Sequence, residues 1–386
     1  MSRRPFSTAL VAILATWAAV SHAQTQADAD LPAAPAKKPI RPSVDHDQPL
    51  VQLAILLDNS GSMSGLIEQA KSELWRVVNE LTTARQHGEQ PRLQVALYTY
   101  GSPPPRQLNA LTDDLDKVSE SLFAVSISGG SEYCGQVIQT ATRDLPWSED
   151  PDDLKLIFIA GNEPFTQGPV DYREACKAAI TRGIMVNTIH CGNGIPEGWR
   201  NGALLADGKS MSINQNTQVA HIEAPQDKEI ASLGSELNKT YLAFGSAAVE
   251  GQVRQQAQDA NALKQSSASF VQRAVSKANA FYRNSSWDLV DAVEDGSADL
   301  AKIKKEELPE NMREMTLDQR KKYVQQQAAA RKRIQQRVNE LNAERNKYVA
   351  AKRKEMAAEA GQKTLDQVLV ESIRAQAIAK AFQFEQ

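Results

Sequence analysis

The sequence has little that would serve the active site of an enzyme. It holds five histidines in 386 residues, and they are scattered without the spacing that a zinc site requires. It also lacks the nucleophile elbow of a serine hydrolase and the phosphate-binding loop of a nucleotide hydrolase. Apolar runs long enough to span a bilayer are absent outside the N-terminus. We therefore expect neither an enzyme nor a mature transmembrane helix.

The N-terminus has the pattern of an export signal. Arg3 and Arg4 precede a short apolar segment over residues 9–20, and a small-x-small triplet follows that ends at Ala23. This pattern predicts a signal peptide over residues 1–23, cut after Ala23, and hence a periplasmic or secreted protein. The paired arginines also resemble a twin-arginine signal, so the route of export stays open. Residues 24–49 are rich in Ala and Pro and predict an extended tether without a fold of its own.

The rest of the chain is organised around a strand, a polar loop and a helix. Residues 50–57 are almost continuously apolar, which is typical of a parallel strand covered on both faces. Residues 66–81 carry apolar side chains at helical spacing. Between them stand Asp58, Ser60 and Ser62, at the carboxyl end of a strand, where open α/β sheets bind ligands. One carboxylate and two hydroxyls suit a hard cation: Mg²⁺, or else Mn²⁺ or Ca²⁺.

This loop resembles the first loop of the von Willebrand factor A (VWA) domain, whose metal-ion-dependent adhesion site (MIDAS) opens with Asp-x-Ser-x-Ser. The setting agrees, because a buried strand precedes the motif and an amphipathic helix follows it. A helix capped by Asp and Ser would give the same letters without any metal. The resemblance implies an exported bacterial VWA protein.

The order of the later elements fits that resemblance as far as residue 246. Apolar runs at 92–98, 154–159 and 184–189 alternate with helical patterns, which predicts a doubly wound, mostly parallel sheet of the Rossmann-like kind. Strand signals vanish after residue 246. We therefore divide the chain into a VWA domain, 50–246, and an all-α C-terminal region, 247–386. Heptad-like spacing in that region favours either a coiled coil or a helical hairpin packed beside the VWA domain.

The resemblance also assigns the other two loops of the metal site. The Gly-rich loop around residues 126–135 would bring Ser131 into the role of the family's threonine, and Glu132 adds a carboxylate. The third loop departs from the family, because Gly161 stands where an aspartate belongs. Either Glu132, Asn162 or Glu163 compensates for the missing carboxylate, or the site holds no metal. The candidate ligands are Asp58, Ser60, Ser62, Ser131 and Glu132.

Protein binding is the function that the resemblance implies. A divalent cation in the site would keep one coordination position open, and an acidic side chain of a partner would fill it. A metal-independent scaffold of an envelope complex, acting through the helical region, is an alternative, and a metal-dependent hydrolase is a third. Residues 320–354 contain twelve Lys or Arg against two Glu. This stretch is either a solvated helix face or a contact for an anionic surface; nucleic acid is not expected as a partner of an exported protein.

Three cysteines remain in the mature chain, an odd number for an oxidising compartment. Cys191 follows a predicted strand, and Cys176 lies near the start of the helix that leads into that strand. Both therefore fall at one edge of the sheet, which favours a Cys176–Cys191 disulfide. Cys134 opens another helix at the same edge and competes for either partner. All three thiols could also be buried and reduced.

Overall fold

The structure is a computed structural model that describes residues 48–81, 83–214, 222–356 and 365–384. The predicted signal peptide lies outside these residues, as does nearly all of the predicted tether. The described residues belong to one compact unit, Ser43–Gln386. None of the helices within the described ranges combines the length and the apolar character needed to cross a membrane.

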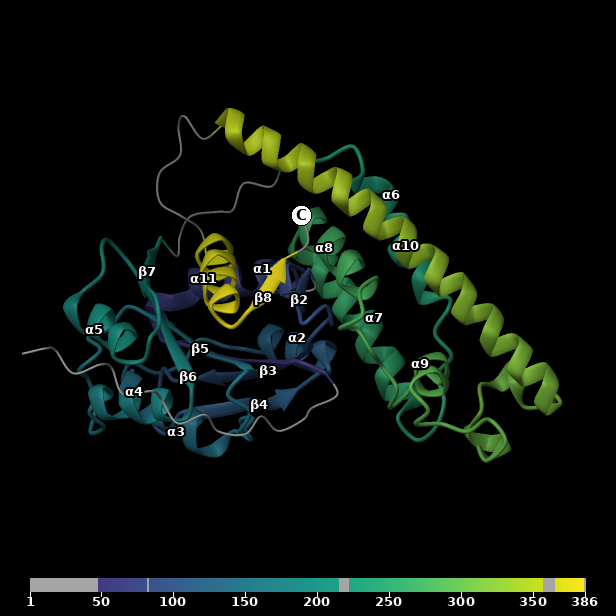
Figure 1. Cartoon of the computed structure of the whole chain (residues 1–386), viewed down its shortest axis with the longest axis horizontal. Helices are drawn as coiled ribbons and strands as arrows, with labels where there is room; N and C mark the ends of the chain where they lie inside the picture. The colour runs from purple at the N-terminus through teal and green to yellow at the C-terminus, as the bar shows by residue number, and fades with distance from the viewer. Residues whose placement is uncertain (1–47, 82, 215–221, 357–364, 385–386) are drawn as a thin grey trace, which may run out of the picture. The chain divides into compact units, whose positions relative to one another are not determined.

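A six-stranded sheet forms the centre of the unit (Figure 1), in the order β4-β3-β1-β5-β6-β7. All neighbouring strands are parallel except the edge strand β4, which is antiparallel to β3. The apolar runs of the sequence form the parallel strands. Such strands are covered on both faces, so nearly every position along them is apolar. The strands are β1 (Leu50–Leu57), β3 (Arg92–Thr99), β4 (Arg106–Thr112), β5 (Leu154–Gly161), β6 (Ile184–Cys191) and β7 (Ser210–Ile213).

Helices cover both faces of this sheet. On one face lie α1 (Ser64–Leu81) and α2 (Leu115–Phe123), whose apolar side chains pack with Leu53 and Leu57 of β1. On the other lie α3 (Cys134–Asp144), α4 (Tyr172–Thr181) and α5 (Glu197–Leu205), packed with Ala54 and Leu56 of the same strand. Alternate residues of β1 thus enter opposite cores. The predicted doubly wound, mostly parallel fold is confirmed.

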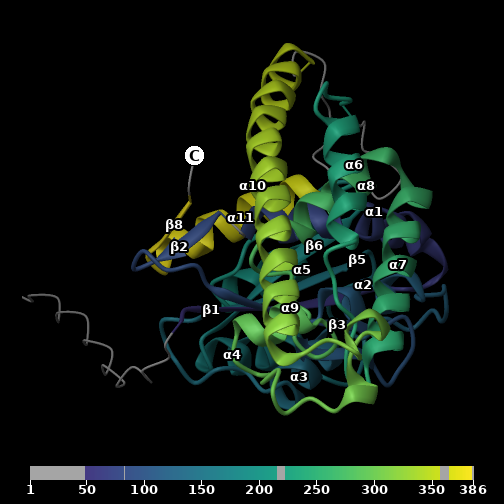
Figure 2. The same ribbon diagram turned by 90° about the vertical axis from the view of Figure 1, so that its right-hand side faces the viewer.

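A group of helices follows the sheet and packs beside it. They are α6 (Asp227–Asn238), α7 (Ala248–Gln265), α8 (Ser267–Lys277), α9 (Leu289–Glu294) and α10 (Leu317–Met356). Figure 2 shows α10 running beside α6 and α8, where Val338 and Leu341 of α10 join a small core with Ile230 of α6 and Val275 of α8. The heptad-like spacing in α10 therefore serves packing against several shorter helices. The prediction that this region is mainly helical is confirmed, but it is not all-α, because it contains the short strand β8 (Phe382–Phe384) near its end.

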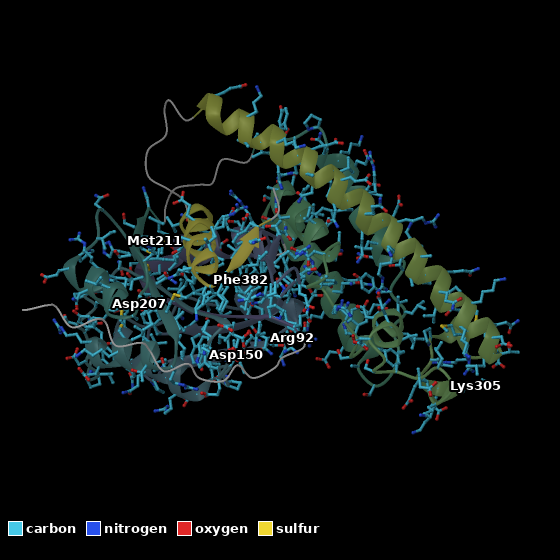
Figure 3. All side chains as sticks on the ribbon, in the orientation of Figure 1. Arg92, Asp150, Asp207, Met211, Lys305 and Phe382 are labelled. Atoms are coloured by element: carbon cyan, nitrogen blue, oxygen red, sulfur yellow. The ribbon has the colours of Figure 1, made fainter. Side chains whose placement is uncertain are left out.

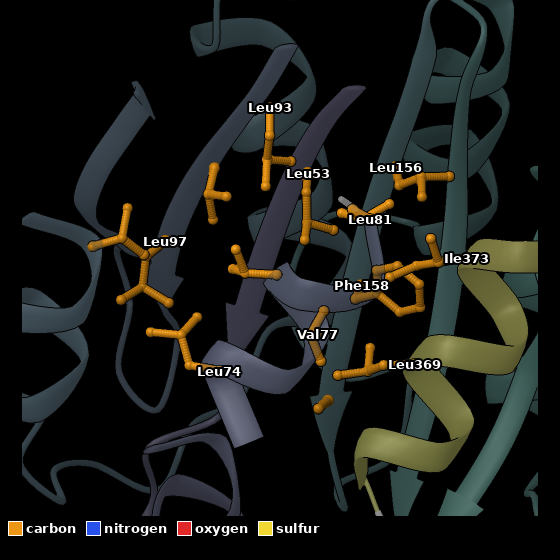
Figure 4. Packing of buried hydrophobic residues seen from close by; sticks show 14 of the residues in the cluster. Leu53, Leu74, Val77, Leu81, Leu93, Leu97, Leu156, Phe158, Leu369 and Ile373 are labelled. Atoms are coloured by element: carbon orange, nitrogen blue, oxygen red, sulfur yellow. The ribbon is translucent and has the colours of Figure 1, made fainter. Parts of the chain in front are cut away.

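The last two elements return to the sheet. In α11 (Leu365–Ala379), Leu369 and Ile373 pack with Phe158 of β5 and Leu81 of α1, as Figure 4 shows. Strand β8 (Phe382–Phe384) pairs antiparallel with β2 (Ala84–Gln86). The domain boundary between residues 246 and 247 stays a prediction, but the packing crosses it, because α11 and β8 help to fill the core of the α/β domain.

Candidate metal site

Asp58 directly follows β1 and is completely buried. Its Oδ1 accepts a hydrogen bond from the backbone N–H of Ser60 at 2.8 Å. Its Oδ2 is buried and has no hydrogen-bond partner among the described residues. A buried carboxylate oxygen without a partner costs free energy, which a bound cation would offset. Asp58 therefore fits the role of a metal ligand.

The electrostatic environment of Asp58 is negative. Burial is the largest effect and raises the pKa of Asp58 to about 6, while the hydrogen bonds from Ser60 oppose that rise. The charges of Glu132 and Glu163 raise the pKa of Asp58 further. Like charges disfavour ionisation of a carboxyl group. Glu132 and Glu163, from the second and third loops, are thus close enough to act on the first-loop ligand.

The two serines of the first loop meet the residue that follows β5. Ser60 Oγ and Ser62 Oγ lie 3.3 Å apart. The amide group of Asn162 contacts Ser62 Oγ, at 3.2 Å from Nδ2 and 3.4 Å from Oδ1. Asn162, one of the residues considered as a compensating group, therefore faces the first loop. The arrangement brings the first and third loops together.

Asn59, between the first two ligands of the motif, holds three loops in place. Its Oδ1 accepts from the N–H of Gly101 at 2.9 Å, and its Nδ2 donates to Ser126 O at 2.9 Å. Its backbone carbonyl accepts from the N–H of Ser128 at 2.7 Å. Sequence reasoning missed this residue, because an asparagine in a polar loop gives no signal beyond a turn. Its amide can both donate and accept, which suits a link between loops.

The Gly-rich loop lies against the end of β3. The carbonyl of Gly101 accepts from the N–H groups of Gly130, at 2.8 Å, and Ser131, at 3.2 Å. Gly129 has φ +93°, and an added Cβ there would overlap with the carbonyl of Gly101. Such a backbone approach requires glycine. It brings Ser131 and the buried Glu132 to the strand-end edge that carries Asp58, but their role as ligands stays a prediction.

Tyr100 explains why position 161 carries no side chain. Its hydroxyl donates to Ala160 O at 2.8 Å and is buried. A Cβ added to Gly161 would overlap with that hydroxyl oxygen and lie 3.0 Å from Cβ of Asp58. The phenol thus occupies the space that the family's aspartate would need. The sequence revealed the departure at Gly161 but not its cause, because Tyr100 directly follows β3, some 60 residues earlier in the chain.

The set of groups at this edge fits a hard divalent cation in chemistry, since it offers one buried carboxylate and several neutral oxygens. Within the described ranges, no group of three or more His, Cys, Asp or Glu side chains could hold a metal ion. A cation here would therefore depend on hydroxyl groups and water as well as on Asp58. Softer metals that prefer sulfur or imidazole ligands find neither in this set.

The cysteines do not pair in the structure. Cys134, Cys176 and Cys191 are all free and buried. Cys176 lies in the core on the α3–α5 face of the sheet, and Cys191 lies in the core on the opposite face. The prediction placed both at one edge but overlooked that alternate side chains of a strand point to opposite faces. Burial raises the pKa of all three thiols, that of Cys176 to about 12, so they are poor nucleophiles.

An open parallel sheet with an oxygen-rich site at its strand ends defines a class of ligand-binding α/β domains. Residues 52–218 match the family model of the von Willebrand factor type A domain, so the chain contains a VWA domain, as the first-loop motif predicted. Domains of this family often bind protein partners, and many hold a divalent cation at a MIDAS. No curated protein matches the chain.

Solved structures of VWA proteins resemble part of the chain. The SpRpn10 VWA domain is 21% identical with a TM-score of 0.36, over 44% of this chain and 90% of that one. Proximal thread matrix protein 1 from the mussel byssus, with a zinc-occupied MIDAS, is 13% identical with a TM-score of 0.35, over 44% and 43%. An aerotolerance-related membrane protein from Bacteroides fragilis is 17% identical with a TM-score of 0.31, over 43% and 93%.

Proposed function

We propose that this chain is an exported protein, periplasmic or secreted, whose VWA domain binds a protein partner through a divalent cation. Asp58, Ser60, Ser62 and Ser131 would hold the cation, with Mg²⁺ the first choice and Mn²⁺ or Ca²⁺ as alternatives. The observation that carries the proposal is the buried Oδ2 of Asp58, which lacks a hydrogen-bond partner among the described residues. When bound, the cation supplies an open coordination position for an acidic side chain of the partner.

Glu132 compensates in this proposal for the missing third-loop aspartate. Its carboxyl group is buried and close enough to raise the pKa of Asp58. A second buried negative charge is unfavourable beside the first unless a cation balances both. The charge of Glu163 also raises the pKa of Asp58.

A calorimetric titration with Mg²⁺ and Mn²⁺, after removal of chelator, tests the metal. Asp58→Ala should abolish binding with little change in circular dichroism, because Asp58 belongs to neither hydrophobic core of the sheet. Asp113→Ala, an exposed carboxylate in another loop, is the matched control and should bind as the wild type does. Glu132→Gln should weaken binding, and unchanged affinity would leave that residue without a metal role. Absence of divalent binding to the wild type would contradict the proposal.

A metal-independent scaffold is the second candidate, and helix α10 favours it. Figure 3 shows side chains extending outward along most of this helix. Its buried arginines are paired: Arg331 with Asp288 and Asp291, and Arg345 with Asp227. Other cations of this helix are exposed and could meet an anionic surface. These exposed cations are Lys321, Lys322, Lys332, Arg333 and Lys347.

Capture of a partner from an envelope extract separates the two candidates. If the metal mechanism holds, EDTA or the change Asp58→Ala abolishes capture of the partner. Adding Mg²⁺ back to the EDTA-treated wild type restores the capture. With the scaffold, capture resists EDTA and is lost when these exposed cations of α10 are replaced by Gln. A broad screen of hydrolase substrates tests the third alternative, a metal-dependent hydrolase.

A further inference from the structure

Helix α7 exposes an apolar stripe that no other part of the described chain covers. Of the seven large hydrophobic side chains exposed in the described residues, three belong to α7: Val249 at 75%, Val253 at 58% and Leu263 at 58%. With the exposed Gln256 and Ala260 they form a row whose members are four, three, four and three residues apart. This alternation is the spacing of a helix seam that packs against another helix.

The opposite face of α7 is firmly held. Asp259 forms ion pairs with Arg273, at 2.9 Å, and Lys277, at 2.6 Å, both on α8. Gln258 accepts a hydrogen bond from Ser119 of α2 at 2.8 Å. Because these groups are buried, α7 cannot rotate to hide its apolar stripe. The stripe is therefore presented to solvent on a rigid support.

The charges beside the stripe are self-complementary. Glu250 and Lys264 lie two heptads apart (264 − 250 = 14) on the same side of the row and carry opposite charges. Glu250 contacts Arg254 of its own helix and remains largely exposed, and Lys264 has no ion-pair partner among the described residues. In two antiparallel helices these flanking positions face each other, so each Glu250 would meet the Lys264 of the other copy.

We propose that α7 pairs with α7 of a second copy of this chain, antiparallel and about a two-fold axis near Ala257. Val253 then faces Leu263 of the other copy, and Gln256 faces Ala260, so that a long polar side chain lies opposite a small one. A two-fold interface of this kind uses the same surface on both copies. The proposal does not depend on the metal site.

The predicted dimer is weak. Stable interfaces bury roughly 1,200–2,000 Å² in total, and one helix of 18 residues from each copy is a small contact by that measure. A shallow hollow of about 510 Å³ continues the surface toward α1 and α2, and Phe123, Ala124, Ala257 and Lys264 are among its lining residues. We expect the dimer to form with rising concentration rather than to be permanent.

Sedimentation velocity over a range of concentrations tests the dimer. The average mass of the wild type should rise toward twice the monomer mass. The pair of changes Val253→Glu and Leu263→Glu should keep the chain monomeric, whereas Leu204→Glu, at a leucine on α5 that is even more exposed, should not. A wild type that is monomeric at every concentration, or a dimer that survives the double change, overturns the proposal.

A second set of variants tests the antiparallel orientation of the two α7 helices. Lys264→Glu alone should weaken the dimer several-fold, and adding Glu250→Lys should restore it. Ala257→Cys should cross-link two copies on oxidation, while Ala329→Cys, exposed on α10, should not. The native thiols do not interfere because they are buried. A dimer that forms but does not cross-link through Ala257→Cys overturns the antiparallel arrangement.

Discussion

Tyr100 and Gly161 form a matched pair beside the candidate metal ligand. The phenol oxygen of Tyr100 lies where a side chain at position 161 would begin. The absence of the family's aspartate is therefore tied to the presence of a tyrosine that directly follows β3, a strand separated from β5 by β1. The negative charge near Asp58 comes instead from Glu132 and Glu163.

Gly161→Asp should destabilise the protein rather than restore the family's site. The new Cβ would overlap with the Tyr100 hydroxyl, and we expect a cost of about 2–4 kcal/mol in the free energy of unfolding. Tyr100→Phe removes the clashing oxygen, so the double variant should cost less than the sum of the two single changes. Urea denaturation of the four proteins measures this coupling, and additive costs would refute it.

Asp291 should make stability depend on pH in the acidic range. Burial first, and then the charge of Asp288, raise the pKa of Asp291 from 3.8 to about 6. Because the folded protein favours the protonated form, the stabilising contribution is complete below pH 3.8 and is lost as the pH rises through 6. We expect this group to lower the free energy of unfolding by about 1–3 kcal/mol between these limits.

Denaturation at several pH values measures that contribution. Asp291→Asn should flatten the pH dependence between pH 4 and 6, because the variant has no carboxyl group to titrate. Asp318→Asn, which changes an exposed carboxylate on α10, should leave the dependence as in the wild type. The same slope in Asp291→Asn as in the wild type would assign the effect to other groups.

Among the elements, the sequence predicted strands better than the packing of helices. Residues 50–57 and 154–159 were recognisable because a strand covered on both faces is apolar at nearly every position. Helix α11 was also expected as a helix. Its apolar stripe shows only that one face is buried, not which surface buries it. The partner surface was invisible because it is made by β5 and α1, some 200 to 300 residues earlier in the chain.

The residues of the metal site also fall into those that the sequence predicted and those that it did not. Asp58, Ser60 and Ser62 were predictable because they are close in sequence and follow a strand of recognisable type. The bridging role of Asn59 and the blocking role of Tyr100 were not, because each depends on contacts between loops that only the folded sheet brings together.

Two isoleucines of α11 offer a matched test of its place in the core. Ile373 is 0% exposed and Ile378 is 62% exposed on the same helix. Ile373→Ala should cost about 2–4 kcal/mol, because it leaves a cavity beneath the helix. Ile378→Ala should change stability by less than about 0.5 kcal/mol. Equal costs in chemical denaturation would mean that α11 does not dock as described.

At the scale of the whole molecule, the VWA domain does not contain all of its own core. A fragment limited to residues 48–246 would lose the cover that α8 and α11 provide over α1. We expect it to melt at a lower temperature than residues 48–386 and to bind a dye that reports exposed apolar surface. Equal melting temperatures without added dye binding would show that the domain is self-sufficient.

The pairing of β2 with β8 has a consequence for the timing of biosynthesis. Residues 84–86 form a two-stranded sheet with residues 382–384. A ribosome must therefore translate almost 300 further codons before the strand made early can be completed, and contacts so distant in sequence form slowly. Until then the nascent chain keeps an apolar surface open to chaperones. A chain that ends before residue 382 lacks both the partner strand of β2 and the cover that Phe382 gives to the core.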